Sequence, residues 1–289
     1  MLNAFHTNWT KPFFLRNEGS AYFIEDYELL TTILSALEWR KHNGSIIMIT
    51  DAVGAEYYNR MGLAHFWDLG VVAILDSLVD DSLYPLSFWA AGKIYALKQQ
   101  SVPCVMIDTD FIAWKSLAAD TNGVTLAVVH REAISREIYP EKSFFNMATD
   151  YHFPDEWDWN ALPCNTAFLY IADEQFKEYY TSESIRFMQN LRETKNITAE
   201  MVFAEQRLLA MCAAARGVQV KTFLDTANLD TQTIFTHVWG LKSELQTDRE
   251  KRREFCRNSL KRITRDFPDE IPVLKKIESL KPYVEAIHE

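Results

Sequence analysis

The first half of the chain alternates short apolar runs with longer stretches of helical periodicity. Continuous apolar runs are typical of strands buried on both faces, and apolar residues three or four positions apart are typical of helices that cover a sheet. The patterns predict strands at 2–6, 46–49, 71–75 and 104–107 and helices at 22–41, 55–61 and 88–99. This alternation predicts an α/β fold, a Rossmann-type sheet flanked by helices.

After residue 115 the pattern changes. Strands are predicted at 124–130, 166–171 and 218–224, helices at 174–193 and 199–216, and loops at 7–19 and 152–160. From residue 240 onward the chain is helical and highly charged, with eight basic and two acidic residues between positions 249 and 265. We therefore expect a mixed-sheet domain over residues 1–240 and a charged helical tail over residues 241–289.

The composition is that of a globular protein with an acidic balance. The chain has 289 residues, of which 48% are hydrophobic and 24% charged, with a formal net charge of -10 and a pI near 5.3. A general nucleic-acid binder should carry a basic balance or stripe, so that class is disfavoured. An anionic substrate would need local positive charge or a bound metal ion.

The cysteines and the N-terminus indicate in which cellular compartment the protein is expected. None of the four cysteines has the spacing of a zinc or redox motif, and Cys104 and Cys164 lie in apolar runs, so we expect buried, reduced thiols. The N-terminus lacks the charged and apolar regions of a signal peptide. No apolar stretch approaches the length needed to cross a bilayer. We expect a cytoplasmic protein without a transmembrane segment.

The strongest candidate for a site is the pair Asp108 and Asp110, which follows the apolar run at 104–107. Alternate residues of an extended chain point the same way, so both carboxylates can face one spot. In open α/β sheets, ligands bind off the carboxyl ends of the strands. A hard divalent ion such as Mg²⁺, often carrying substrate phosphates, would relieve the repulsion between the two carboxylates. The alternative is a pair of acidic residues in a solvated loop.

Further motifs follow a fixed order along the chain. They are Lys93 before the acidic pair, then Asn165-Thr166-Ala167, Glu205-Gln206 and His237-x-x-Gly240-x-Lys242. In this order they resemble the motifs of GT-A-type glycosyltransferases, the broad group with glycogenin-like and mannosyltransferase-like enzymes, over roughly residues 2–242. Three features depart from the pattern: Val102-Pro103-Cys104 stands where relatives often carry Gly-Gly-x-Tyr, Ala167 stands where they carry glycine, and the interval to Lys242 is one residue shorter.

The resemblance implies a GT-A-like fold and a role for each motif. The residues that would bind Mn²⁺ or Mg²⁺, and through it the diphosphate of a nucleotide-sugar, are Asp108, Asp110 and His237. The residues that would contact the donor are Lys93, Lys242, Thr50 and Asp51. The residues that would lie near the reacting sugar are Glu205, Gln206 and Asn165. For Thr50 and Asp51, which end the run at 46–49, a cap for the following helix is the simpler interpretation.

The expected function is therefore a metal-dependent, hexosyltransferase-like glycosyltransferase that uses a nucleotide-sugar, with UDP as the expected nucleotide, and a sugar or glycan acceptor. One alternative is a phosphotransferase of the haloacid-dehalogenase type, which also places Asp-x-Asp after an apolar strand and would use Asp108 as nucleophile. Another is a non-catalytic nucleotide-sugar-binding protein. The basic stretch at 249–265 leaves open a peripheral membrane contact, although a solvated amphipathic helix face is the better explanation.

Overall fold

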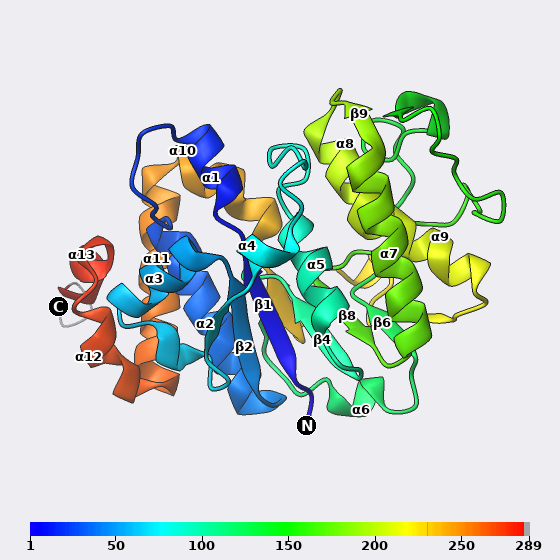
Figure 1. The fold of residues 1–289 in the computed structure, drawn as a ribbon. Helices are drawn as coiled ribbons and strands as arrows, with labels where there is room; N and C mark the ends of the chain where they lie inside the picture. The colour runs from blue at the N-terminus through cyan, green and yellow to red at the C-terminus, as the bar shows by residue number, and fades with distance from the viewer. Residues whose placement is uncertain (230, 286–289) are drawn as a thin grey trace.

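The computed structural model describes residues 1–229 and 231–285, which form a seven-stranded sheet between two layers of helices (Figure 1). The strand order is β10-β6-β8-β4-β1-β2-β3. The strands are β1 (Ala4–Asn8), β2 (Ile46–Thr50), β3 (Val71–Ala73), β4 (Cys104–Ile107), β6 (Leu126–Val128), β8 (Phe168–Ile171) and β10 (Val220–Thr222). Strand β8 runs antiparallel to β4 and β6, whereas the other neighbours are parallel. The predicted α/β class with a mixed sheet is confirmed.

Helices cover both faces of this sheet. One layer contains α2 (Asp26–His42) and α3 (Ala52–Arg60), and the other contains α5 (Ala91–Gln99), α7 (Glu174–Asn190) and α9 (Leu208–Ala215). In β4, Val105 and Ile107 join the core under α2, while Cys104 and Met106 join the core under α5 and α7. Because successive strand residues point to opposite faces, a strand covered on both sides reads as one continuous apolar run.

The C-terminal helices join the helix layer on the α2 side of the sheet, where α11 packs against α2 (Figure 1). They are α10 (Lys242–Thr247), α11 (Arg249–Asp266), α12 (Ile271–Leu274) and α13 (Lys281–Glu285). Cys256, Leu260 and Ile263 of α11 are buried in the core that α2 also enters. The helical character of the C-terminal part is confirmed, and the division into two domains at residue 240 stays a prediction. Across residues 1–229 and 231–285, the structure has no helix that is both long and apolar enough to cross a membrane.

One predicted helix ends earlier than expected, and one predicted loop contains a helix. The helix predicted at 174–193 ends at Asn190, whose side chain donates to the carbonyl of Arg186, and the next residues form β9 (Leu191–Glu193) paired with β7 (Asn146–Met147). The loop predicted at 7–19 contains helix α1 (Lys11–Arg16), with Pro12 in its first turn, where a missing N–H has no cost. The other short helices are α4 (Leu75–Leu78), α6 (Ala118–Thr121) and α8 (Ile197–Val202).

A second, two-stranded sheet was missed by the sequence patterns. It pairs β5 (Phe111–Ala113) with β11 (Phe235–His237) in antiparallel register, and Phe111 lies opposite His237. Each strand has three residues, which is too short for an alternation to be visible. This small sheet begins directly after Asp110 and therefore determines what lies beside the acidic pair.

Candidate functional site

The acidic pair lies in the turn between β4 and β5. The backbone N–H of Asp108 donates to the carbonyl of Ala167 on the neighbouring chain segment, at 2.9 Å, and the N–H of Phe111 donates back to the carbonyl of Asp108, at 3.0 Å. The N–H of Val238 donates to the carbonyl of Asp110, at 3.1 Å. The end of β11 is thereby held against the acidic pair, and His237 enters the site from a segment more than a hundred residues away in sequence.

Asp108, Asp110 and His237 form a group that could hold a metal ion. One ligand atom from each residue can be chosen so that all three lie within 4.8 Å of one another. His237 Nε2 lies 3.6 Å from Asp110 Oδ1 and 3.8 Å from Asp108 Oδ2, and this buried nitrogen has no hydrogen-bond partner within residues 1–229 and 231–285. Two carboxylates and one imidazole are suitable ligands for Mn²⁺, and carboxylate oxygens suit Mg²⁺. The residues present thus fit the expected ion.

A lysine flanks each of the two carboxylates. Lys242 Nζ lies 2.9 Å from Asp110 Oδ2, and Lys93 Nζ lies 2.5 Å from Asp108 Oδ1. Burial alone would raise the pKa of Asp110, but Lys242 and His237 more than offset it and hold this pKa below its usual value. Burial works against the charge of Lys242 as well, yet Asp110 keeps its pKa raised. The site therefore presents one ammonium group beside each of the two carboxylates.

Glu205 lies behind Lys93 and is 3% exposed. It belongs to a short π-helical segment, Phe203–Arg207, which interrupts the helix between α8 and α9. Such segments are frequent at functional sites. The carboxylate of Glu205 pairs with Lys93 and accepts a hydrogen bond from the Thr166 hydroxyl, at 2.8 Å. Burial raises the pKa of Glu205, although Lys93 counteracts the effect.

The other two residues predicted near the reacting sugar have internal partners. The Gln206 side chain accepts a hydrogen bond from the Tyr139 hydroxyl, at 2.6 Å. The Asn165 amide donates to Glu132, at 2.9 Å, and its oxygen accepts from the backbone N–H of Ala167, at 3.2 Å. The Asn165 contacts fix the segment that precedes β8, and the Gln206 contact joins the π-helical segment to Tyr139. The expected catalytic roles of Asn165 and Gln206 stay predictions.

Thr50 and Asp51 also have internal partners, and neither lines the cavity beside the acidic pair. Asp51, 2% exposed, caps α3 by accepting from the N–H of Gly54, at 2.9 Å, and it accepts two hydrogen bonds from Thr10. The Thr50 hydroxyl donates to the carbonyl of Asn8. A Cβ added at Gly54 would lie 2.0 Å from the Thr50 hydroxyl oxygen, so only glycine fits there. The helix-cap interpretation matches this geometry, whereas nucleotide contact has no support from it.

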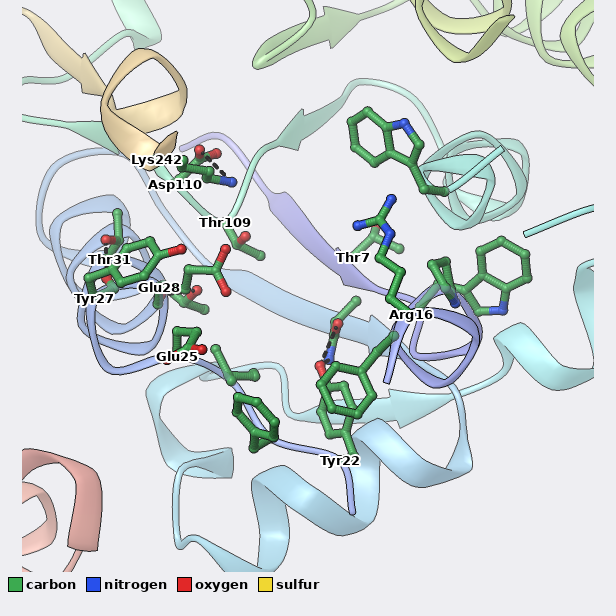
Figure 2. A pocket seen from close by; sticks show the side chains of 18 of the residues that line it. Thr7, Arg16, Tyr22, Glu25, Tyr27, Glu28, Thr31, Thr109, Asp110 and Lys242 are labelled. Carbon is green, nitrogen blue, oxygen red and sulfur yellow. Dashed lines mark hydrogen bonds and ion pairs between the residues drawn. The ribbon is translucent and has the colours of Figure 1, made fainter. Parts of the chain in front are cut away.

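A cavity of two lobes opens beside the metal-binding group, and Figure 2 shows side chains that line the larger lobe. The larger lobe, about 460 Å³, lies between α1, the start of α2 and Asp110. The smaller lobe, about 180 Å³, adjoins Lys93 and Asp108. The lobes share Thr109, Asp110 and Lys242, together with Trp89, which is 38% exposed at the rim. The acidic pair thus lies where the two lobes meet.

Several residues of the cavity were not found by sequence reasoning, among them Glu28, Arg16 and Trp89. Glu28 of α2 and Arg16 of α1 line the larger lobe, and Trp89 lines both lobes. An acidic residue in the first turn of a helix is ordinarily explained by its favourable interaction with the helix dipole. Arg16 lies in the segment predicted to be a loop, and Trp89 lies at the start of a predicted helix. No local signal in the sequence separates these residues from ordinary surface positions.

Comparison with known proteins places the chain in a family. Residues 2–277 match the profile of a family of unknown function, DUF6734, and the chain belongs to that family. No curated protein matches the sequence.

Two solved glycosyltransferases are similar in structure. One is the bifunctional glycosyltransferase WbbM, at 10% identity and a TM-score of 0.40, over 77% of this chain and 38% of that chain's length. The other is mouse xyloside xylosyltransferase 1, at 8% identity and a TM-score of 0.39, over 79% of this chain and 89% of that one. At such TM-scores the likeness carries no functional argument, which has to come from the residues of the site.

Proposed function

We propose that the protein is a metal-dependent glycosyltransferase that takes a sugar from a nucleotide-sugar, with UDP as the expected nucleotide, and transfers it to a sugar or glycan acceptor. The observation that carries the proposal is the group of Asp108, Asp110 and His237 at the junction of two cavity lobes. A nucleotide-sugar has its diphosphate in the middle, with a nucleoside on one side and a sugar on the other. A charged centre between a large and a small lobe suits a ligand of that shape.

The charges of the site support a diphosphate at its centre. Two negative groups at close range repel each other by about 4 kcal/mol at an effective dielectric constant of 20, so carboxylates alone would reject a diphosphate. Lys242 lies on the cavity wall beside Asp110 and can turn its ammonium group to a phosphate oxygen. A divalent ion bound there would supply a Lewis acid that stabilises the charge developing on the leaving diphosphate.

The smaller lobe is the proposed place for the sugar. Lys93 lines it and is held between Asp108 and Glu205. In this proposal Glu205 keeps the Lys93 ammonium fixed at the sugar side of the acidic pair. Asn165 and Gln206 would contribute indirectly, by holding in place the chain segments in which they lie.

The phosphotransferase alternative is less well supported. In that mechanism the second aspartate acts as the acid that protonates a leaving group, while Asp108 attacks. Asp110 is paired with Lys242, and its pKa is lowered, so it would seldom carry a proton to give. Incubation with beryllofluoride separates the two functions, because a covalent mimic on Asp108 would support the phosphotransferase and contradict the glycosyltransferase.

A thermal-shift screen of nucleotide-sugars, each with Mn²⁺, tests the proposed function. A ligand at a hundred times its dissociation constant adds about 2.7 kcal/mol of stability, which is easily measured. Stabilisation by one donor, followed by its hydrolysis or by transfer of its sugar, would support the proposal. Stabilisation without either reaction, across a broad panel of acceptors, would favour the non-catalytic binding protein.

A peripheral membrane contact through the C-terminal helices also stays a prediction. It is supported by four basic residues that recur every fourth position along α11, namely Arg249, Arg253, Arg257 and Lys261. None of these four forms an ion pair with any residue that the structure describes. Co-sedimentation with vesicles rich in phosphatidylserine tests this contact.

A further inference from the structure

The wall of the larger lobe contains a carboxylate that forms no ion pair within residues 1–229 and 231–285. Glu28 lies in the first turn of α2 and points into the cavity (Figure 2). Its side chain makes no hydrogen bond or ion pair with any residue that the structure describes. Glu25, which lines the same lobe, differs from it, because its carboxylate lies 2.5 Å from Arg252 Nη2. Glu28 is therefore free to accept hydrogen bonds from a ligand.

Glu28 lies between two chemically distinct ends of the lobe. The ion pair of Asp110 and Lys242 is on one side of it in Figure 2, and Tyr22 is on the other. Burial raises the pKa of Glu28, and the charges of Lys242, which lowers this pKa, and of Asp110, which raises it, are close enough to act on it, in agreement with this placement. Tyr22 forms an aromatic group with Phe13 and Phe23, with ring centroids 5.0 Å and 5.1 Å from Phe13.

This order of groups matches the order of groups in a nucleoside diphosphate. The phosphates belong at the cationic end near Lys242, because the charge of Glu28 repels them. The base has a flat apolar face and belongs near the aromatic rings. The ribose lies between the two, and its 2′ and 3′ hydroxyls are neighbouring donors that one carboxylate can accept together, as an acidic residue does in dinucleotide-binding folds.

We propose that Glu28 binds the ribose hydroxyls of the nucleotide and makes the site selective for ribonucleotides over 2′-deoxyribonucleotides. This inference rests on the proposed function. It adds that the larger lobe recognises the ribose of the nucleotide. A site built to pair with a hydroxyl rejects the analogue that lacks it, because a buried acceptor is then left without a partner.

The test is calorimetric titration, with Mn²⁺ present, of UDP, GDP, ADP and CDP and of the 2′-deoxy form of each. The wild-type protein is expected to bind its best ribonucleotide at least about tenfold more tightly than the 2′-deoxy form. In Glu28→Ala that ratio is expected to fall close to one, mainly because the ribonucleotide binds more weakly. Glu28→Gln, which keeps the size of the side chain, serves if the alanine variant does not fold.

Glu25→Gln is the matched control, because Glu25 lines the same lobe but is already paired with Arg252. This variant is expected to keep the wild-type ratio. The role of Glu28 would be overturned if both Glu28 variants kept the wild-type ratio of affinities, or if the wild-type protein bound the ribonucleotide and its 2′-deoxy form equally tightly. Either result would leave the glycosyltransferase proposal intact. Failure of every nucleoside diphosphate to bind would overturn both proposals.

Discussion

Phe111 and His237 lie opposite each other in the antiparallel pair formed by β5 and β11, and this pairing brings the His237 imidazole to within 3.6 Å of Asp110. The backbone pairing of β5 with β11 thus positions His237, the third residue of the candidate metal group. Since β5 begins directly after Asp110, the same short sheet positions the carboxylate and the imidazole together. The group is therefore a rigid feature of the fold.

Replacing His237 tests whether the imidazole is a ligand. We expect His237→Ala to fold and to need at least about tenfold more Mn²⁺ for nucleotide binding, since even the loss of a group that only orients a ligand costs 10- to 100-fold in metal affinity. Electron paramagnetic resonance of free Mn²⁺ measures the change. His65→Ala is the control, because His65 pairs with Glu270 away from the site. An unchanged Mn²⁺ requirement in His237→Ala would remove His237 from the metal group.

Replacing Lys93 tests the buried charge cluster. Lys93→Met leaves the carboxylates of Asp108 and Glu205 without their shared cation, and breaking a buried pair in this way costs about 3–5 kcal/mol. Chemical denaturation measures the loss. Lys98→Met is the matched control, because Lys98 pairs with the exposed Glu178 and such pairs contribute about 1 kcal/mol or less. Equal losses in the two variants would show that the buried cluster stabilises the fold no more than the exposed pair does.

Replacing Arg252 tests how the C-terminal helices are attached. Arg252 Nε lies 2.7 Å from Asp26 Oδ1, its Nη2 lies 2.5 Å from Glu25 Oε2, and the Tyr283 hydroxyl donates to the other oxygen of Asp26. We expect Arg252→Met to lower the free energy of unfolding by about 1.5–3 kcal/mol, as for other charged hydrogen bonds. Arg253→Met, one position away on the exposed face, should change it by less than about 0.5 kcal/mol. An unchanged free energy of unfolding in Arg252→Met would contradict this attachment.

The buried His6 predicts a dependence of stability on pH. His6 accepts a hydrogen bond from Trp67 Nε1, at 3.1 Å, and its other ring nitrogen lies 3.0 Å from the Ser35 hydroxyl oxygen. Burial lowers the pKa of His6 to about 3, and Asp108 offsets only part of this effect. The unfolded chain, with a histidine pKa near 6.5, therefore binds a proton that the folded protein excludes below that pH. Stability contributed by neutral His6 is present above pH 6.5 and is lost as the pH falls towards 3.

The expected slope is about 1.4 kcal/mol of unfolding free energy for each pH unit below about 6. Urea denaturation between pH 6.5 and pH 5 measures this slope before most carboxylates titrate. His6→Gln should be less stable at neutral pH but should show a shallower slope in the same window. An equally steep slope in that variant would assign the dependence to other groups.

Sequence reasoning found the parts of the site that local rules govern. Asp108 and Asp110 follow a buried strand, so the alternation of side chains was enough to place them. His237 came only from the resemblance, because the three-residue strands that bring it to Asp110 leave no periodic signal. The contact between Lys93 and Glu205 joins residues 112 positions apart and depends on how α5 packs against the π-helical segment, which no local pattern encodes.

The central claim is that Asp108 and Asp110, with a divalent ion, hold a nucleoside diphosphate. Calorimetric titration of UDP, GDP, ADP and CDP into the wild-type protein and into Asp110→Asn, each with Mn²⁺ and again with EDTA, tests it most directly. The account predicts that at least one nucleotide binds the wild-type protein only when Mn²⁺ is present, and that Asp110→Asn weakens this binding at least about tenfold. Binding that is equally tight in EDTA or in Asp110→Asn, or no binding of any nucleotide, would contradict it.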